Sequence, residues 1–389
     1  MRVALIYKRY ALHGGSERQL SMLARDLAER GHEVHVFCRS VRADPPPDVT
    51  LHVMPPLPLP GSAAMFVFSA WARWACARHE RRHGPFDVHH AYGRTVGQDV
   101  YRVGGGCHRT YLEHAHALDR PAWWRRWARS SPAQKWKADL EQRALSAPPG
   151  PFVITNSGMV RDDLIYRYSL PAEKLTVVHN GVDLNRFRPP VDDERTAMRE
   201  TWGVQSDDEV VLFLGTGFAR KGLEATLRAV ASLGAERPRL RLVIAGRDGK
   251  MPRWQRLAAE LGLHEQVIWA GPTSTPEACY RGADVYALPT AYDPAANSTL
   301  EALASGLPVV TSAMNGAAEI LDEGTHGTIL PCPVHPDDLA AALSHWLDQA
   351  DDSAVREQNR ERARGFPAAG SCEQILDVYR AMLAHRNSP

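Results

Sequence analysis

Cysteine is scarce in this sequence, and the cysteines that do occur are scattered. There are six among 389 residues, and no two of them form a Cys-x-x-Cys pair. Zinc sites and disulfide frameworks both depend on closely or regularly spaced cysteines. The sequence therefore indicates neither, and we expect free, mostly buried thiols.

Long apolar runs are also missing. The chain has no uninterrupted stretch of the roughly 18 apolar residues that would cross a bilayer. Met1-Arg2 leads directly into the apolar, strand-like segment Val3–Tyr7, which does not follow the pattern of a signal peptide. These two absences predict a cytoplasmic protein.

Net charge is almost absent, at +1, but it is unevenly distributed. Through Arg188 the chain has 27 lysines and arginines against 17 acids, a balance of +10, and the remainder has 19 against 28, a balance of −9. A basic amino-terminal half favours an anionic partner, such as a nucleic acid, a phosphorylated glycan or an anionic membrane. The asymmetry would equally serve solubility or the docking of two domains.

Internal repetition is absent as well, which excludes a solenoid. The length exceeds one typical hydrophobic core and fits two domains of about 150–200 residues each. Strand-like apolar segments alternate with helical patterns, which predicts parallel sheets covered by helices. We expect strands at 3–7, 33–38, 49–54, 87–90, 153–155, 176–178, 210–214, 241–245, 267–270, 285–288, 309–311 and 327–330.

The predicted fold class is α/β, with two Rossmann-like, doubly wound domains facing a central cleft. The Pro-, Asp- and Glu-rich stretch 188–194 marks the junction, which gives an amino-terminal domain of residues 1–188 and a carboxyl-terminal domain of residues 189–370. Open parallel sheets bind ligands at the carboxyl ends of their strands. We therefore expect the ligand there.

One segment near residue 300 carries most of the functional signal. Asp293 and Glu301 stand eight residues apart, and a helix is expected to begin between them with Asn297 or Ser298 as its cap. The N–H groups and positive dipole end of such a helix suit a phosphate. The carboxylates would accept hydrogen bonds from hydroxyls on either side of it, such as those of a sugar and a ribose. A phosphate between two polyols is a nucleotide sugar.

This segment resembles the donor-site motif of the retaining family-4 glycosyltransferases, in which an acidic residue, seven intervening residues and a glutamate precede Ala-x-x-x-Gly-x-Pro-Val. Asp293 stands where the family usually has glutamate. The resemblance covers nearly the whole chain. It implies the two-domain GT-B architecture, with a final helix at about 371–389 that packs back on the first domain.

A second donor motif follows the strand expected at 210–214. Gly217 precedes the cations Arg220 and Lys221, and a helix is expected to begin near Leu223. A forked cation and a point cation beside a glycine suit a diphosphate, and a solvated basic turn is the alternative. In the resembled family the corresponding arginine and lysine hold the donor diphosphate and offset its charge as it leaves.

Gly14 and Gly15 precede the first helix, where Ser16 or Glu17 would support the helix start. An ordinary loop-to-helix turn would use the same residues. In the resembled family this loop faces the donor phosphates and sugar.

His108 follows the glycine run Gly104–Gly106. A titratable ring beside flexible backbone suits a sugar pocket or an acceptor contact. We predict that His108 contacts the transferred sugar or stabilises charge in the transition state. A structural role is the alternative, because the chain has 17 histidines, and the competing candidates are His89, His90, His114 and His116.

A basic aromatic stretch occupies residues 120–143, with seven cations, two acids and four tryptophans. Tryptophan rings favour the headgroup level of a bilayer, and lysine and arginine add attraction to anionic lipid. We predict peripheral contact with an anionic membrane surface through Trp123, Trp124, Arg125, Arg126 and Trp127. Core helices of the first domain are the alternative. No RNA-binding signature accompanies the stretch, so no nucleic-acid partner is predicted.

Within the family, the chain looks like the bacterial lipopolysaccharide core glucosyltransferases that act on heptose, which are peripheral on the inner membrane. This narrower resemblance rests on the segments 7–10, 14–15, 99–101 and 220–222 and on the donor motif. A glycine run stands near residue 105, where those enzymes would have an acidic residue. The resemblance implies a cytoplasmic protein on the inner face of the cytoplasmic membrane.

The implied activity is a retaining, metal-independent hexosyltransferase. It would move glucose or an N-acetylglucosamine-type sugar from a UDP-sugar to a hydroxyl of a cell-envelope glycan or lipid-linked acceptor, with lipopolysaccharide core expected. No cofactor is expected besides the donor substrate. A nucleotide-sugar epimerase or isomerase, and a non-catalytic nucleotide-sugar-binding protein at the membrane, are the alternatives.

Each donor group then has an expected partner. Asp293 would hold sugar hydroxyls, Glu301 the ribose, and backbone N–H groups of Ala296 through Ser298 would assist the cations at the diphosphate. Uracil is expected near Pro272 and Thr273. The residues expected at the reacting sugar and leaving group are His108, Asp293, Arg220 and Lys221.

Overall fold

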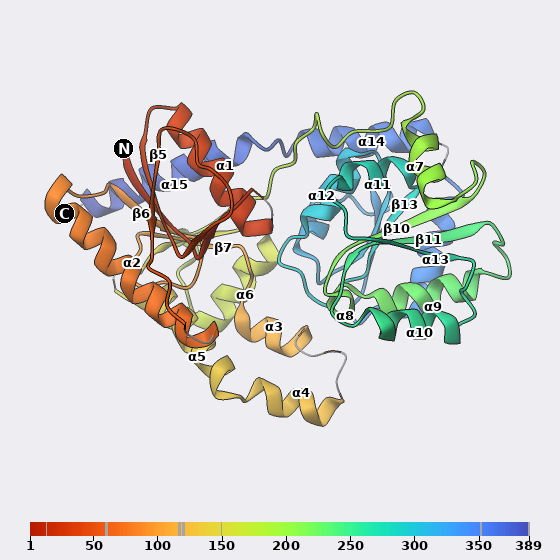
Figure 1. Ribbon diagram of the computed structural model, residues 1–389, viewed down its shortest axis with the longest axis horizontal. Coiled ribbons are helices and arrows are strands. Elements are labelled where there is room, and N and C mark those ends of the chain that lie inside the picture. The colour runs from red at the N-terminus through yellow and green to blue at the C-terminus, as the bar shows by residue number, and fades with distance from the viewer. Residues whose placement is uncertain are drawn as a thin grey trace. The chain divides into compact units, whose positions relative to one another are not determined.

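The computed structural model describes residues 1–12, 14–58, 61–115, 118, 121–148, 150–350 and 352–387. They form two compact units (Figure 1). Unit 1 comprises Met1–Asn180 and Ala369–Pro389, and unit 2 comprises Gly181–Ala368. The division falls ahead of the stretch 188–194, where helix α7 (Glu194–Trp202) already begins.

Unit 1 is built on a seven-stranded sheet in the order β5-β3-β1-β6-β7-β8-β9. All of its strand pairs are parallel. The strands are β1 (Arg2–Ile6), β3 (Glu33–Cys38), β5 (Val49–Val53), β6 (Val88–Ala91), β7 (Val100–Val103), β8 (Phe152–Thr155) and β9 (Leu175–Val177), and a separate short pair consists of β2 (Arg9–Tyr10) and β4 (Ser40–Val41).

Strand β7 was missing from the sequence-based prediction. Its four residues are all buried, but the third is Arg102, and a charged residue interrupts the apolar pattern that indicates a buried strand. The other predicted strands are present, with ends shifted by one or two residues at most.

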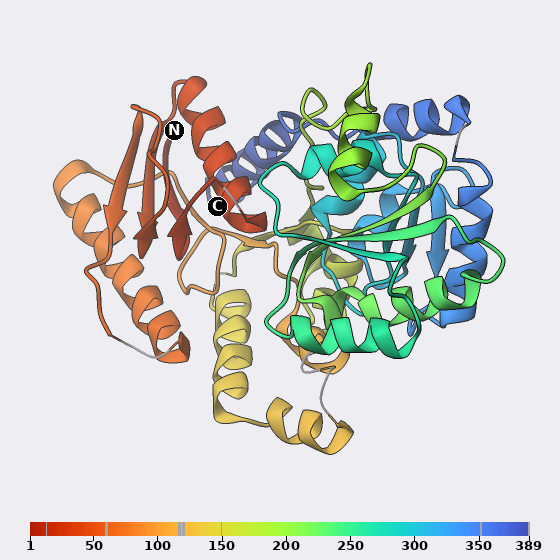
Figure 2. The same cartoon turned by 45° about the vertical axis from the view of Figure 1, so that its right-hand side comes forward.

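Helices cover both faces of this sheet, as Figure 2 shows. On one face α1 (Gly15–Glu29) packs with α15 (Gly370–Asn387), through apolar side chains that include Leu23 and Tyr379. On the other face α2 (Gly61–His83), α5 (Pro132–Ser146) and α6 (Gly158–Tyr168) contribute to a second core. The remaining helices of unit 1 are α3 (His108–His114), α4 (Ala122–Arg129) and η1 (Ala172–Lys174).

Unit 2 is built on a six-stranded parallel sheet in the order β12-β11-β10-β13-β14-β15. Its strands are β10 (Glu209–Thr216), β11 (Leu240–Arg247), β12 (Val267–Gly271), β13 (Val285–Leu288), β14 (Val309–Ser312) and β15 (Gly327–Leu330). The helices are α7, α8 (Phe218–Lys221), α9 (Leu223–Leu233), α10 (Met251–Glu260), α11 (Pro276–Gly282), α12 (Asn297–Ala304), η2 (Gly316–Ile320), α13 (Pro336–Leu347) and α14 (Ser353–Arg364).

The strand order reverses once in each sheet, between β1 and β6 in unit 1 and between β10 and β13 in unit 2. Each unit is therefore a doubly wound, Rossmann-like sheet, which confirms the predicted fold class. Ligands of such sheets bind beyond the carboxyl ends of the strands at the point of reversal. That rule directs attention to the segments after β10 and β13 and after β1, β6 and β7.

The cysteines match expectation, since all six are free and five are buried. Within the described part of the chain, no helix combines the length and apolar character that a membrane crossing requires.

Candidate functional site

The reversal point of unit 2 brings together the predicted cations and the first carboxylate of the donor motif. Lys221 Nζ and Arg220 Nη1 each donate a hydrogen bond to the same atom, Asp293 Oδ2, at 2.6 Å. Lys221 is 7% exposed and Asp293 8%. Lys221 and Asp293 are more than 70 residues apart in the sequence, and they meet because β10 and β13 are neighbouring parallel strands.

The charges of this trio decide the state of the carboxyl group. Burial acts to raise the pKa of Asp293, but the charges of Lys221 and Arg220 and their hydrogen bonds outweigh it and hold that pKa below its usual range. The carboxylate is therefore ionised, and the trio has one positive charge in excess.

The backbone around the cations is tightly constrained. Arg220 and Lys221 lie in the four-residue helix α8, and α9 begins at Leu223 as predicted. Gly222, which joins the two helices, has φ of +87°, and a Cβ there would stand 2.1 Å from the carbonyl oxygen of Pro289. Only glycine fits this close approach.

Asp293 is held by its backbone as well as by its side chain. Its N–H donates to Met314 O at 2.8 Å, and its carbonyl accepts from the N–H of Gly316 at 2.8 Å. Between these two residues Asn315 is buried, and its Oδ1 accepts from Ala296 N at 3.2 Å. Sequence reasoning missed Asn315, because an Asn-Gly pair indicates a turn without showing which segment the side chain will reach.

The start of α12 differs from the prediction. Its N-cap residue is Ala296, with no side-chain cap, so the proposed capping by Asn297 or Ser298 is wrong. Both residues lie in the first turn of the helix, and Asn315 reaches the loop from outside instead. The backbone N–H of Ala296 therefore already donates a hydrogen bond to Asn315, whereas the prediction left it for a phosphate.

The second carboxylate, Glu301, lies in the second turn of α12, and its Oε2 accepts a hydrogen bond from Tyr280 Oη at 3.1 Å. Burial, followed by the charge of Glu301, raises the pKa of Tyr280 well above its ordinary value. Tyr280 therefore stays protonated and orients Glu301. Pro272 and Thr273 are exposed directly after β12, at the same edge of the sheet.

The reversal point of unit 1 contains a pocket of about 210 Å³. It is lined from the ends of β1, β6 and β7 and from the starts of α1 and α2, by residues that include Tyr7, Lys8, Ser16, Met65, Phe68, Tyr92, Arg94, Arg102 and Gly104–Gly106. The two glycine segments meet here, because a Cβ on Gly104 would lie 3.2 Å from Ser16 Oγ. Gly14 is the N-cap residue of α1 and Gly15 its first residue. The N-cap has no side-chain hydrogen bond, and Glu17 is the acidic residue of the first turn.

Two arginines line this pocket, the partly buried Arg94 and the buried Arg102, and they differ in their partners. Arg94 Nε donates to Glu141 Oε2 at 2.7 Å, and Glu141 is fully buried. Arg102 is 2% exposed and donates through Nη2 to Asn180 Oδ1 at 3.1 Å and to Val178 O at 3.3 Å. Its Nη1 has no hydrogen-bond partner among the described residues.

His108 does not line this pocket. Its ring is buried, its Nε2 lies 2.9 Å from Gln134 Oε1, and its backbone N–H donates to Glu141 Oε1 at 2.8 Å. Burial, followed by the charge of Arg94, lowers the pKa of His108 to about 4. The ring is therefore neutral at pH 7, and its contacts connect α3 to α5.

Two of the competing histidines have partners of their own. His89 Nδ1 lies 3.0 Å from Asp99 Oδ2, and His90 Nδ1 lies 2.7 Å from Tyr379 Oη. His114 is the last residue of α3, and His116 lies outside the described residues.

The described part of the basic aromatic stretch forms α4 and most of α5, and α4 extends away from the sheet of unit 1 in both views (Figures 1 and 2). Trp123 is 71% exposed and Trp127 68%, whereas Trp124 is partly buried. The exposed indoles and the neighbouring arginines are available to a partner. The apolar segment Ala63–Ala75 belongs to α2, where Phe68 and Ala72 are buried in the core.

Comparison with known proteins gives a consistent result. The model of Glycosyltransferase Family 4 matches residues 13–186, and that of Glycosyl transferases group 1 matches residues 194–365. A D-inositol 3-phosphate glycosyltransferase of Kineococcus radiotolerans is 31% identical over 406 residues, covering 96% of this chain and 92% of its own length.

Two solved structures show the same fold. WaaG, a glycosyltransferase involved in lipopolysaccharide biosynthesis, superposes with a TM-score of 0.81 at 24% identity, covering 97% of this chain and 99% of its own. Alr3699/HepE of Anabaena, in complex with UDP-glucose, has a TM-score of 0.71 at 17% identity, covering 98% and 100%. The two-unit architecture is that of the GT-B glycosyltransferases.

Proposed function

Because this chain belongs to the group 1 glycosyltransferases, we propose that it transfers a hexose from a nucleotide diphosphate sugar to a hydroxyl of an anionic polyol acceptor. The observation that carries the donor part is the cation pair Arg220 and Lys221, held on Asp293 at the reversal point of unit 2. A UDP-sugar is the favoured donor. The complex of Alr3699/HepE with UDP-glucose supports this choice.

The donor diphosphate takes over the two cations. Phosphate oxygens accept charge-assisted hydrogen bonds as carboxylates do, and a diphosphate offers more of them than the single oxygen of Asp293. Asp293 is then released to accept hydrogen bonds from the sugar hydroxyls. Glu301, oriented by Tyr280, accepts from the ribose.

The proposed reaction retains the configuration at the anomeric carbon and needs no metal. The bond from that carbon to the phosphate oxygen breaks, the bond to the acceptor oxygen forms on the same face, and the leaving phosphate takes the acceptor proton. Arg220 and Lys221 stabilise the charge that develops on the leaving group, the task for which other enzymes use a divalent ion.

The acceptor is assigned to the pocket of unit 1. Lys8, Arg94 and Arg102 line it, and this basic lining favours a phosphate or another anion. An inositol phosphate, as named for the Kineococcus relative, and a phosphorylated cell-envelope glycan such as lipopolysaccharide core are both phosphorylated polyols. The experiment below distinguishes them.

The protein acts at the inner face of the cytoplasmic membrane in this proposal. Exposed Trp123 and Trp127 enter the headgroup region, and the neighbouring arginines of α4 contact anionic lipid.

The test is nucleotide release without added metal from UDP-glucose, UDP-N-acetylglucosamine, UDP-galactose and GDP-mannose. Each donor is combined with inositol 3-phosphate, with a heptose-containing core glycan, or with no acceptor. Release of one nucleotide that depends on one acceptor, and is lost in Lys221→Met and Glu301→Gln, supports the proposal and names both substrates. An Arg102→Met variant should raise the acceptor KM at least about tenfold with little change in the donor KM.

Two outcomes would contradict the proposal. Conversion of the donor without any acceptor would indicate an epimerase, the alternative that the family comparisons do not favour. Absence of nucleotide binding, measured by calorimetry, would contradict the assignment of the donor site itself.

A further inference from the structure

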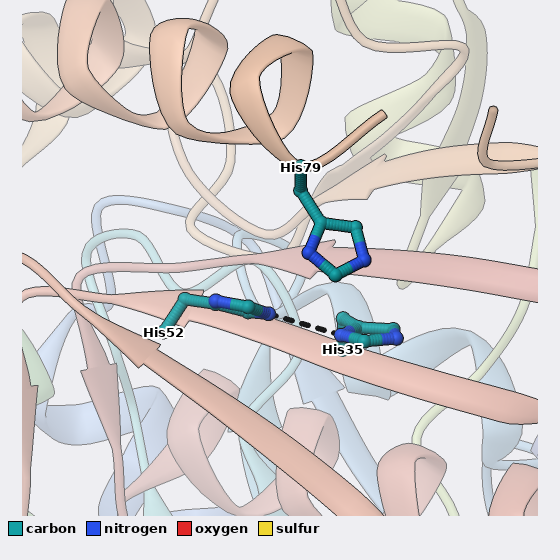
Figure 3. A group of neighbouring side chains, drawn as sticks. All are labelled: His35, His52 and His79. Carbon is teal, nitrogen blue, oxygen red and sulfur yellow. Dashed lines mark hydrogen bonds between the residues drawn. The ribbon is translucent and has the colours of Figure 1, made fainter. Parts of the chain in front are cut away.

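Three histidines meet on the face of the unit 1 sheet that α2 covers. His35 comes from β3, His52 from β5 and His79 from α2, and Figure 3 shows the three rings turned toward one another. One ring nitrogen from each lies within 4.8 Å of the others. In the described part of the chain this is the one group of histidine, cysteine or acidic side chains with such spacing.

The register of the sheet creates this meeting. Phe37 of β3 pairs with His52 of β5, so His35 and His52 lie on adjacent strands two positions apart along β3. Alternate residues of a strand share a face, so both rings point toward α2. Their nearest nitrogens, His35 Nδ1 and His52 Nε2, are 2.9 Å apart, and the ring of His79 lies 4.6 Å from that of His35 and 5.2 Å from that of His52, centroid to centroid.

His35 has a second partner on its other nitrogen. Its Nε2 lies 2.9 Å from Glu33 Oε1, while Glu33 Oε2 accepts from Arg2 Nε at 2.9 Å. A histidine whose outer N–H donates to a carboxylate is oriented and made more basic at the inner nitrogen, an arrangement that accompanies histidine ligands in metal sites. His35 is 6% exposed, so a bound ion would be largely shielded from water on that side.

We propose that His35, His52 and His79 form a site for a divalent transition-metal ion, with Zn²⁺ as the best-fitting ion. Three imidazoles with one open position are a frequent zinc ligand set, and imidazole suits zinc better than it suits magnesium or calcium. The fold provides the ligands from three different elements. The site is separate from the donor and acceptor groups described above and does not depend on the proposed transfer reaction.

The adjustment that the ion requires is small. With Zn–N bonds of about 2.0–2.1 Å, tetrahedral ligands lie about 3.4 Å apart. The His35–His52 pair must open by about 0.5 Å and His79 must move inward, changes within reach of side-chain rotation. The proton between His35 Nδ1 and His52 Nε2 moves to the outer nitrogen of His52 by a change of tautomer, which leaves both inner lone pairs to the ion.

The charge state of the ligands agrees with this role. Burial, followed by the neighbouring histidines, lowers the pKa of His52 to about 4, and burial also lowers the pKa of His79. Both rings are therefore neutral at pH 7, the form that binds metal. Arg2 Nη2 lies 3.5 Å from His79 Nε2 and opposes a cation there, while the ionised Glu33 offsets it.

A bound ion would fix the carboxyl-terminal part of α2 to β3 and to the edge strand β5. The same helix supplies Met65 and Phe68 to the pocket of unit 1. Phe68 precedes His79 by 11 residues, roughly 16 Å along the helix axis. The ion would therefore stabilise the helix that shapes one wall of the pocket without touching the acceptor.

The test uses the full chain without an affinity tag. Zn²⁺ is added by equilibrium dialysis at pH 7, bound metal is counted by mass spectrometry, and thermal unfolding is followed with and without Zn²⁺. We expect one Zn²⁺ per chain and a melting temperature that rises on addition. His52→Gln and His79→Gln should each weaken binding by at least about tenfold, whereas His264→Gln, an exposed histidine of unit 2, should bind as the wild type does.

Equal Zn²⁺ binding in all three variants, or no stoichiometric binding in the wild type, would overturn the proposal. Far-UV circular dichroism without metal shows whether each variant is folded. A variant that does not fold is replaced by a measurement on the wild type with Co²⁺. Strong visible absorption of a tetrahedral complex with nitrogen ligands supports the site, and the weak spectrum of six-coordinate cobalt contradicts it.

Discussion

Replacing Asp293 by asparagine tests the donor site most directly, because one oxygen of this side chain holds both cations. The substitution keeps the shape and removes the charge. Lys221 and Arg220 then lose the acceptor that each contacts at 2.6 Å. The consequences for stability and for nucleotide binding have opposite signs.

The stability effect follows from burial. Removing one partner of a buried ion pair costs about 3–5 kcal/mol, because the other charge is left without compensation. Arg220 is partly exposed and keeps its hydrogen bond to Tyr292 O at 3.0 Å, so we expect the lower end, about 3 kcal/mol of unfolding free energy. The pKa of Asp293 is held low in the folded state, so this stabilisation is present at neutral pH and is lost as the pH falls below about 4.

The binding effect follows from competition. In the wild type a diphosphate must displace the carboxylate of Asp293 from both cations. In Asp293→Asn the two cations have no carboxylate on that side chain, so the diphosphate displaces no anion. We expect UDP to bind the variant about tenfold more tightly, which is about 1.4 kcal/mol. Sugar transfer should nevertheless fall by at least about 100-fold, since the group proposed to hold the sugar hydroxyls is lost.

Calorimetric titration with UDP measures the binding effect, and urea unfolding at pH 7 and at pH values below 4 measures the stability effect. The matched control is Asp207→Asn, whose carboxylate contacts Arg239 at the same distance of 2.6 Å, but with both side chains 62% exposed. Exposed pairs contribute little, so the control should unfold and bind as the wild type does. Weaker UDP binding in Asp293→Asn than in the wild type would refute the competition argument.

Three further predictions follow from other parts of the chain. Gly222→Ala should lower the unfolding free energy by at least about 3 kcal/mol in urea titrations, because φ is +87° and the new Cβ meets a carbonyl oxygen. Gly262→Ala is the control and should cost only about 1–2 kcal/mol, because φ is +74° but no atom lies within 4 Å of the new Cβ. Equal losses of stability in the two variants would contradict this reasoning. Because the pKa of His108 falls from 6.5 to about 4 on folding, the unfolded state takes up the proton first, so stability should drop as the pH falls from about 6.5 toward 4. His108→Gln should remove up to about 3 kcal/mol of that pH dependence, and an unchanged dependence would contradict the assignment. The double variant Trp123→Ser/Trp127→Ser should bind anionic vesicles at least about tenfold more weakly in sedimentation assays, and undiminished binding would exclude these exposed rings as the contact.

Much of the architecture could be predicted from the sequence, because buried parallel strands appear as short apolar runs between helical patterns. The runs at 33–38, 285–288 and 327–330 coincide with β3, β13 and β15. Strand β7 could not be predicted in this way, since a buried arginine at position 102 hides it. The predicted boundary at residue 188 differs from the observed division after Asn180. Proline and acidic residues mark a loop, but they do not show which of the two units the loop packs against.

The donor cations and carboxylates could be predicted as groups, but their connections could not. The residues that fix Asp293 lie outside the motif, such as Lys221, Met314 and Gly316. Helix capping failed for a related reason, since Asn315 reaches the loop before α12 and no local side chain is needed. The buried Glu141, which holds Arg94, left no sequence signal beyond an acid in a basic stretch.

The division of the chain also sets an order of events during synthesis. Unit 2 is one uninterrupted segment, whereas unit 1 needs residues from both before and after it. Helix α15 supplies Tyr379 and other side chains to the core of unit 1, so that core stays incomplete on the ribosome until these residues have emerged. The residues of unit 2 all emerge before helix α15 does, so unit 1 is the last of the two units to complete its core.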